Sequence, residues 1–129
     1  MSGSRISQGR GAGMQGHRDL IVWQKAMNLV TVIYRLTQEF PRQEAYGLAS
    51  QIQRAAVSIP SNIAEGHALK QTQAYLRHLA IASGSLAEVE TQLEIAHRLG
   101  YLECEFDKVL AQAGEIGRML MGLRKSLKV

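Results

Sequence analysis

One segment carries carboxylate and imidazole groups at a spacing that could bind a metal ion. Glu88, Glu90 and Glu94 precede His97, and Glu94 and His97 form one Glu-x-x-His pair. Di-iron bundles use this pair in two copies on two inward-facing helices. The sequence has no second copy, and no two of its four histidines share a helix at a metal-binding spacing. We therefore expect these groups to be solvated or ion-paired, and we predict no metal site and no cofactor.

Other reaction centres are not supported by the residue spacing. No serine lies in a G-x-S-x-G elbow or beside an evident base. The glycine-rich stretch 9–16 lacks the lysine and helix start of a phosphate-binding loop. We expect no catalytic residues and a protein that is not an enzyme.

Cysteine usage and hydropathy limit where the protein works. Cys104 is the only cysteine, which excludes an internal disulfide and favours the cytoplasm; we expect it to be an incidental loop thiol. No apolar run reaches the roughly 18 residues of a membrane span. We predict a cytoplasmic protein without a membrane partner.

A polar cluster surrounds the proline in YGLASQIQRAAVSIPSNIAEG, residues 46–66. Pro60 removes a backbone donor within a helical pattern, so we expect a bend there, with nearby Ser or Asn side chains bonding the freed backbone groups. In an antiparallel pair of helices Arg54 would lie beside Ser85 and Glu88 and form an ion pair with Glu88. Asn62 would lie beside Arg77, and Glu65 would reach the next helix. The predicted cluster, structural or a ligand-binding notch, is Arg54, Ser58, Asn62, Glu65 and Glu88.

Charge is distributed unevenly along the chain. The net charge is +4 and the isoelectric point is about 9.5. In an up-and-down bundle one end would gather eight cations, opposed only by Asp19 and Glu65: Arg18, Lys25, Lys70, Arg77, Arg118, Arg124, Lys125 and Lys128. The opposite end would hold Glu39, Glu44, Glu88, Glu90, Glu94, Glu103, Glu105, Asp107 and Glu115. This basic end could bind phosphate backbones, although cations at helix C-termini also suit the helix dipole.

The periodicity predicts an all-α protein. We expect residues 1–16 to form a flexible basic Gly/Ser-rich tail, either a leader or a binding arm, and residues 17–129 to form one domain. Apolar residues recur at alternating steps of three and four over residues 19–40, 45–67, 72–98 and 106–127. Short connections then give an antiparallel up-down-up-down four-helix bundle with its second helix bent at Pro60. Asp19 is the expected N-cap of the first helix, and Gly100 ends the third.

The first helix carries two apolar seams. One seam is Leu20, Trp23, Met27, Val30 and Tyr34, and the other is Val22, Ala26, Leu29, Ile33, Leu36 and Phe40. A single bundle core needs only one of them, so the sequence predicts self-association or a central helix.

Three blocks resemble a known family. DLIVWQKA at residues 19–26, YGLASQIQRAAVSIPSNIAEG, and GSLAEVETQLEIAHRLGYL at residues 84–102 are similar to the signature blocks of bacterial four-helix bundle proteins encoded in intervening sequences of the 23S ribosomal RNA gene. The resemblance extends over residues 17–127. It implies a ring-like homopentamer and a role with RNA or DNA, and related proteins accompany the reverse transcriptases of diversity-generating retroelements. It implies no active site.

The sequence leaves two functions open beside an enzyme, which the missing ligand pairs disfavour. The first is a non-catalytic oligomeric protein that binds nucleic acid, principally RNA, through the basic end. The second is a protein-interaction scaffold or an accessory subunit of a reverse transcriptase or another nucleic-acid enzyme.

Overall fold

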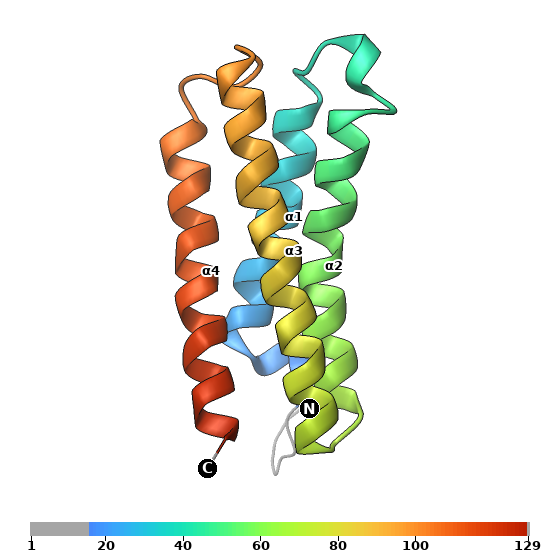
Figure 1. The fold of residues 1–129 in the computed structure, drawn as a ribbon, viewed down its shortest axis with the longest axis vertical. Helices are drawn as coiled ribbons and strands as arrows, with labels where there is room; N and C mark the ends of the chain where they lie inside the picture. The colour runs from blue at the N-terminus through green and yellow to red at the C-terminus, as the bar shows by residue number, and fades with distance from the viewer. Residues whose placement is uncertain (1–15, 129) are drawn as a thin grey trace, which may run out of the picture.

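Four long helices make up nearly all of the described chain. The computed structural model describes residues 16–128, and the predicted N-terminal tail lies outside them except for Gly16. The elements are η1 (His17–Asp19), α1 (Ile21–Thr37), η2 (Arg42–Glu44), α2 (Leu48–Ala68), α3 (Thr72–Arg98) and α4 (Phe106–Leu127). The predicted all-α four-helix bundle is confirmed. Figure 1 shows the four helices side by side, with the colour running in opposite directions along consecutive helices.

Contacts between α2 and α3 fix their relative direction. Ser85 Oγ donates to Ser58 Oγ at 2.8 Å, and Asn62 Oδ1 lies 2.9 Å from His78 Nδ1. Moving forward along α2 therefore means moving backward along α3, so the two helices are antiparallel.

Two ion pairs show that α1 and α4 are also antiparallel. Lys25 Nζ lies 3.4 Å from Glu115 Oε1, and Arg35 Nη2 lies 3.5 Å from Glu105 Oε1. Both pairs are substantially exposed, so they contribute little stability. Their value here is as markers of the antiparallel register.

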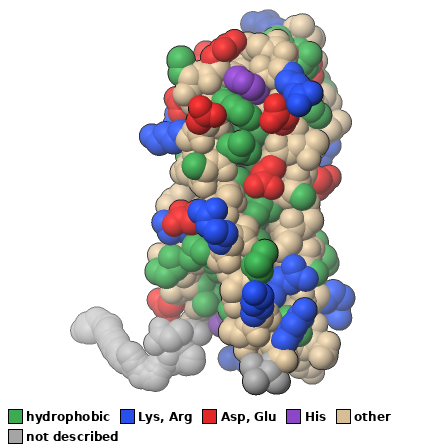
Figure 2. Space-filling view, turned by 60° about the vertical axis from the view of Figure 1, so that its left-hand side comes forward, with side chains coloured by type: hydrophobic (Ala, Val, Ile, Leu, Met, Phe, Trp, Pro, Cys, Tyr) green, Lys and Arg blue, Asp and Glu red, His purple; other side chains and the backbone are tan. Residues whose placement is uncertain are grey.

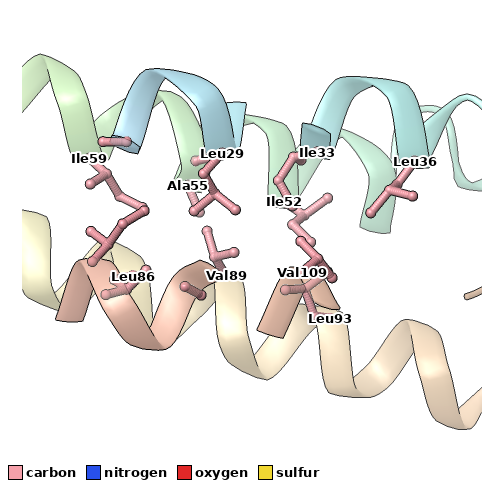
Figure 3. Close-up of a cluster of buried hydrophobic side chains, with 14 of the residues drawn as sticks. Leu29, Ile33, Leu36, Ile52, Ala55, Ile59, Leu86, Val89, Leu93 and Val109 are labelled. Carbon is pink, nitrogen blue, oxygen red and sulfur yellow. The ribbon is translucent and has the colours of Figure 1, made fainter. Parts of the chain in front are cut away.

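The core lies along the bundle axis, where branched side chains from all four helices meet (Figure 3). Fully buried members come from every helix: Leu29, Ile33, Ile52, Ile59, Ile63, Leu79, Val89, Leu93, Val109, Ile116 and Leu120. Burial of each such side chain is worth about 1.5–3 kcal/mol. The apolar residues predicted from the periodicity of all four helical ranges supply this core.

The two seams of α1 have different environments. The seam that contains Leu29 and Ile33 is buried in the core from Val22 to Phe40. The seam that contains Met27 and Tyr34 stays on the surface, where these two side chains are 40% and 44% exposed. We call Leu20, Trp23, Met27, Val30 and Tyr34 the outer seam.

The helix ends differ in part from the predictions. Asp19 is not the N-cap of α1: it lies in η1, and Leu20 caps α1 without a side-chain bond. In this short 3₁₀ turn the Leu20 N–H donates to the His17 carbonyl, so α1 begins only after the turn, at Ile21. Gly100 ends α3 as predicted, with φ +81° and the Tyr101 N–H bonding the Ala96 carbonyl.

Helix α2 continues through Pro60 without interruption. Asn62 Nδ2 donates to the Ser58 carbonyl at 2.9 Å, so an amide side chain does bond the backbone here. The acceptor is not the Ala56 carbonyl, which is the group that Pro60 leaves without its helical donor. The bend at Pro60 stays a prediction.

Candidate nucleic-acid interface and polar groove

Cations gather toward the end of the bundle where α4 finishes, as Figure 2 shows on one face. The acidic side chains on this face are more frequent toward the opposite end. Of the eight predicted cations, Arg18, Lys70, Arg77, Arg118, Lys125 and Lys128 are exposed. Only Lys25 among the eight forms an ion pair with an acidic side chain of residues 16–128. This end therefore presents guanidinium and ammonium groups directly to solvent.

The predicted division of charges between the two ends is wrong for one pair of residues, Lys25 and Glu115. Glu115 was expected at the acidic end, but it lies beside Lys25 at 3.4 Å. The basic end is consequently less positive by one charge, and Lys25 is its weakest candidate because its ammonium is already paired.

Two further cations of this end have local contacts. The Arg18 guanidinium lies 5.7 Å from the centre of the Trp23 ring, within the range of a cation–π interaction. Arg124 Nη1 is 3.4 Å from Ser83 Oγ on α3, a long hydrogen bond. Neither contact neutralises the charge of the arginine.

Lys70 has an unusual backbone conformation. It follows the last turn of α2 with φ +55°, and among residues 16–128 no other residue except glycine has a positive φ. Its N–H bonds the His67 carbonyl. Glycine or asparagine normally occupies such a left-handed position because a Cβ is strained there. A lysine at this turn places a charge at the basic end at some cost in stability.

Of the five residues in the predicted polar cluster, only Ser58 and Asn62 are hydrogen-bonded to each other. Ser58, Asn62, His78 and Ser85 form a chain of hydrogen bonds between α2 and α3. Arg54 does not pair with Glu88 within 4.0 Å; its guanidinium donates to Ser50 one turn earlier.

Two other contacts of the cluster also differ from the predictions. The neighbour of Asn62 is His78 rather than Arg77, because Arg77 lies on the exposed side of α3. Glu65 is exposed and makes no side-chain hydrogen bond or ion pair with another described residue. The sequence reasoning missed His78, whose imidazole ends the chain of bonds on the α3 side by pairing with Asn62.

Helices α2 and α3 approach closely beside this chain. A Cβ placed on Gly66 would lie only 2.7 Å from His78 Cβ and 3.1 Å from Tyr75 Cδ1. The Tyr75 hydroxyl is buried without a hydrogen-bond partner, and this burial raises its pKa above the usual 10.0. Gly66 therefore sets the helix spacing at this level of the bundle.

A hollow of about 390 Å³ opens between α2 and α3 next to the chain of hydrogen bonds. Its walls are Gln51, Arg54, Ala55, Ser58, Ser85, Glu88 and Gln92. Sequence reasoning placed Arg54, Ser85 and Glu88 together correctly but missed Gln51 and Gln92. Their helical spacing could have found them, since Gln51 lies three residues before Arg54 and Gln92 four residues after Glu88.

Neither a metal centre nor a membrane span is present in the described part of the chain. Within residues 16–128 no three His, Cys, Asp or Glu side chains are grouped so that they could hold a metal ion. Glu94, a member of the Glu-x-x-His pair, instead bonds Arg98 Nε at 3.1 Å. None of the four helices has the length and apolar character needed to cross a bilayer.

Comparison with known proteins gives a family assignment. Residues 18–122 match the family model described as 23S rRNA-intervening sequence protein. The chain belongs to this family. This confirms the resemblance drawn from the three sequence blocks.

A solved structure supports the family's fold. It is described as a protein with unknown function from the S23 ribosomal protein family from Bacteroides thetaiotaomicron VPI-5482. It superposes with a TM-score of 0.76 at 25% identity and covers 81% of this chain and 99% of its own. No curated protein matches the sequence. The matched relative of this 23S rRNA-intervening sequence protein thus supports the four-helix bundle fold.

Proposed function

We propose that this 23S rRNA-intervening sequence protein is a non-catalytic, self-associating protein that binds RNA through its basic end. The single observation that carries the proposal is the set of six exposed cations there, none of which forms an ion pair within 4.0 Å among residues 16–128. Unpaired surface cations can displace the counterions of a phosphate backbone, which gives sequence-independent and salt-sensitive binding. Lys70 supports the same conclusion because it holds a strained turn without a structural need for a lysine.

The outer seam supports self-association. Trp23, Met27 and Val30 line an apolar hollow with Val57 and Pro60 of α2, and its volume is about 390 Å³. Contiguous apolar surface of this kind is typical of a protein interface. Several basic ends in one assembly would bind one RNA with high avidity, because later contacts become intramolecular. The number of subunits, five, is implied by the family resemblance alone.

An anisotropy titration with a labelled RNA at two salt concentrations tests the basic end. Replacing Arg124, Lys125 and Lys128 with glutamine should lower the affinity strongly. If all three contact phosphates, the slope of log affinity against log salt should fall by about 2 units. The matched control replaces three cations of the opposite end, Arg42, Arg98 and Lys108, and should leave affinity and slope nearly unchanged.

The second candidate function is a protein-interaction scaffold or an accessory subunit of a nucleic-acid enzyme such as a reverse transcriptase. The exposed outer seam favours it, since an apolar face can bind a different protein as well as a second copy. Equal losses in both triple variants, or no RNA binding at low salt, would leave this candidate as the better one.

A further inference from the structure

The hollow between α2 and α3 has properties that RNA binding at the basic end does not use. It lies against residues 51–58 of α2 and residues 85–92 of α3. None of the eight basic-end cations lines it. It combines a charged rim with a floor of uncharged polar groups, so we consider it as a separate site.

The floor has one spare donor and one spare acceptor. Ser58 Oγ accepts a hydrogen bond from Asn62 Nδ2 at 3.0 Å and shares a second bond with Ser85 Oγ at 2.8 Å. Whichever serine donates to the other, one hydroxyl proton remains without an acceptor among the described residues. Gln92 Oε1 is buried and has no hydrogen-bond partner. A buried polar atom without a partner destabilises the folded state, and a bound group that donates to it would recover this loss.

The two walls have opposite character. Arg54 and Ser58 are four residues apart on α2, so they lie on one face and present donors. Glu88 and Gln92 have the same spacing on α3 and present acceptors. Arg54 and Glu88 do not form an ion pair with each other within 4.0 Å, so both charged groups are available to a ligand.

We propose that this hollow binds a small zwitterion of the α-amino-acid class. The carboxylate of the ligand lies against the Arg54 guanidinium and the spare serine hydroxyl. Its ammonium lies against the Glu88 carboxylate and Gln92 Oε1. The positive wall on α2 then faces the negative group of the ligand, and the negative wall on α3 faces its positive group. Charge-assisted hydrogen bonds of this kind are about twice as strong as neutral ones.

A ligand-observed NMR screen of the twenty standard amino acids against the full chain tests the proposal. We expect at least one to give a saturation-transfer signal, and calorimetry then gives its affinity. Arg54→Gln and Glu88→Gln should each weaken binding about 10- to 100-fold, because each removes one charge-assisted hydrogen bond. Gln92→Met should also weaken binding. Arg35→Gln, which breaks an exposed ion pair between α1 and α4, should have no effect.

Single-charge probes separate a zwitterion site from a simple ion site. Acetate carries only the negative group and methylammonium only the positive one, so both should bind far more weakly than the selected amino acid. The proposal is overturned if no amino acid binds at roughly 10 mM, which corresponds to very weak affinity. It is also overturned if either single-charge probe binds as well, or if the folded Arg54→Gln and Glu88→Gln variants bind like the wild type. RNA affinity is measured in parallel and should be unaffected by the amino acid.

Discussion

Glu44 accepts a hydrogen bond at Oε2 from the Tyr101 hydroxyl at 3.0 Å, although 57 residues separate them in sequence. The other oxygen, Oε1, accepts from the Leu48 N–H at the start of α2 at 3.1 Å. A single carboxylate therefore caps α2 and ties it to the connection between α3 and α4.

This contact predicts a pH dependence of stability. The hydrogen bond to the Glu44 carboxylate raises the pKa of Tyr101 above 10.0, with smaller effects from burial and the Glu44 charge. The folded state thus holds the phenolic proton more tightly than the unfolded state. The stabilisation should be complete below pH 10 and should be lost as the pH rises through the folded pKa. Urea unfolding between pH 8 and pH 11 measures it.

Tyr101→Phe is the control for this titration. It removes the titrating hydroxyl but keeps the ring that lies 5.6 Å from Phe40. The difference in unfolding free energy between wild type and variant should shrink above pH 10. A constant difference across this range would contradict the prediction.

Gly66→Ala should destabilise the bundle by about 1–3 kcal/mol, the usual cost of overpacking. The added methyl group would meet His78 Cβ at 2.7 Å, and neither helix can move away without disturbing the core. Gly84→Ala on α3 is the matched control, because a Cβ there meets no atom within 4 Å. It should stabilise the protein by up to about 1 kcal/mol. Thermal or urea unfolding measures the stability of both variants. Equal stabilities would contradict the close approach of α2 and α3 at Gly66.

Lys70→Gly should separate stability from binding. Removing the Cβ from a left-handed residue should raise the unfolding free energy by about 1 kcal/mol, while the lost ammonium should weaken RNA binding. Gly100→Ala is the mirror experiment at the end of α3 and should destabilise by a similar amount. Unfolding and RNA titrations on the same samples measure both effects. A Lys70→Gly variant that binds RNA like the wild type would remove Lys70 from the interface.

Replacing Met27 and Tyr34 with serine should dissociate the assembly. Both side chains are exposed in the single chain, so the subunit should stay folded while the outer seam loses its apolar contacts. Light scattering should report a smaller particle than the wild type at the same micromolar concentration. Leu99→Ser, an exposed apolar position after α3, should leave the mass unchanged. A wild-type protein that is already monomeric would end this interpretation.

Periodicity in the sequence predicts the helices and the core well because the burial of a helix face depends on local spacing. The seam of α3, with Leu79, Leu86 and Leu93 one heptad apart, is buried as predicted. The axial register between helices is not a local property. Lys25 and Glu115 were therefore assigned to opposite ends although they are in contact, since the position of Glu115 along the bundle axis depends on how α4 packs against α1.

The same reasoning explains the polar cluster. Helical spacing brings Arg54 and Glu88 to one hollow, but the guanidinium bonds Ser50 on its own helix rather than crossing to α3. Side-chain conformers of long charged residues are decided by such short competing contacts. The sequence predicts neighbours here better than it predicts bonds.

The chain of hydrogen bonds between α2 and α3 also disfavours misfolded arrangements in which the two helices pack in a shifted register. Apolar seams with a heptad repeat pack almost equally well after a shift of one helical turn. Such a slip would move Ser85 away from Ser58 and His78 away from Asn62, and would leave buried or partly buried polar groups without these partners. The four side chains thus raise the energy of the misaligned hairpin, so their main contribution is to the uniqueness of the fold.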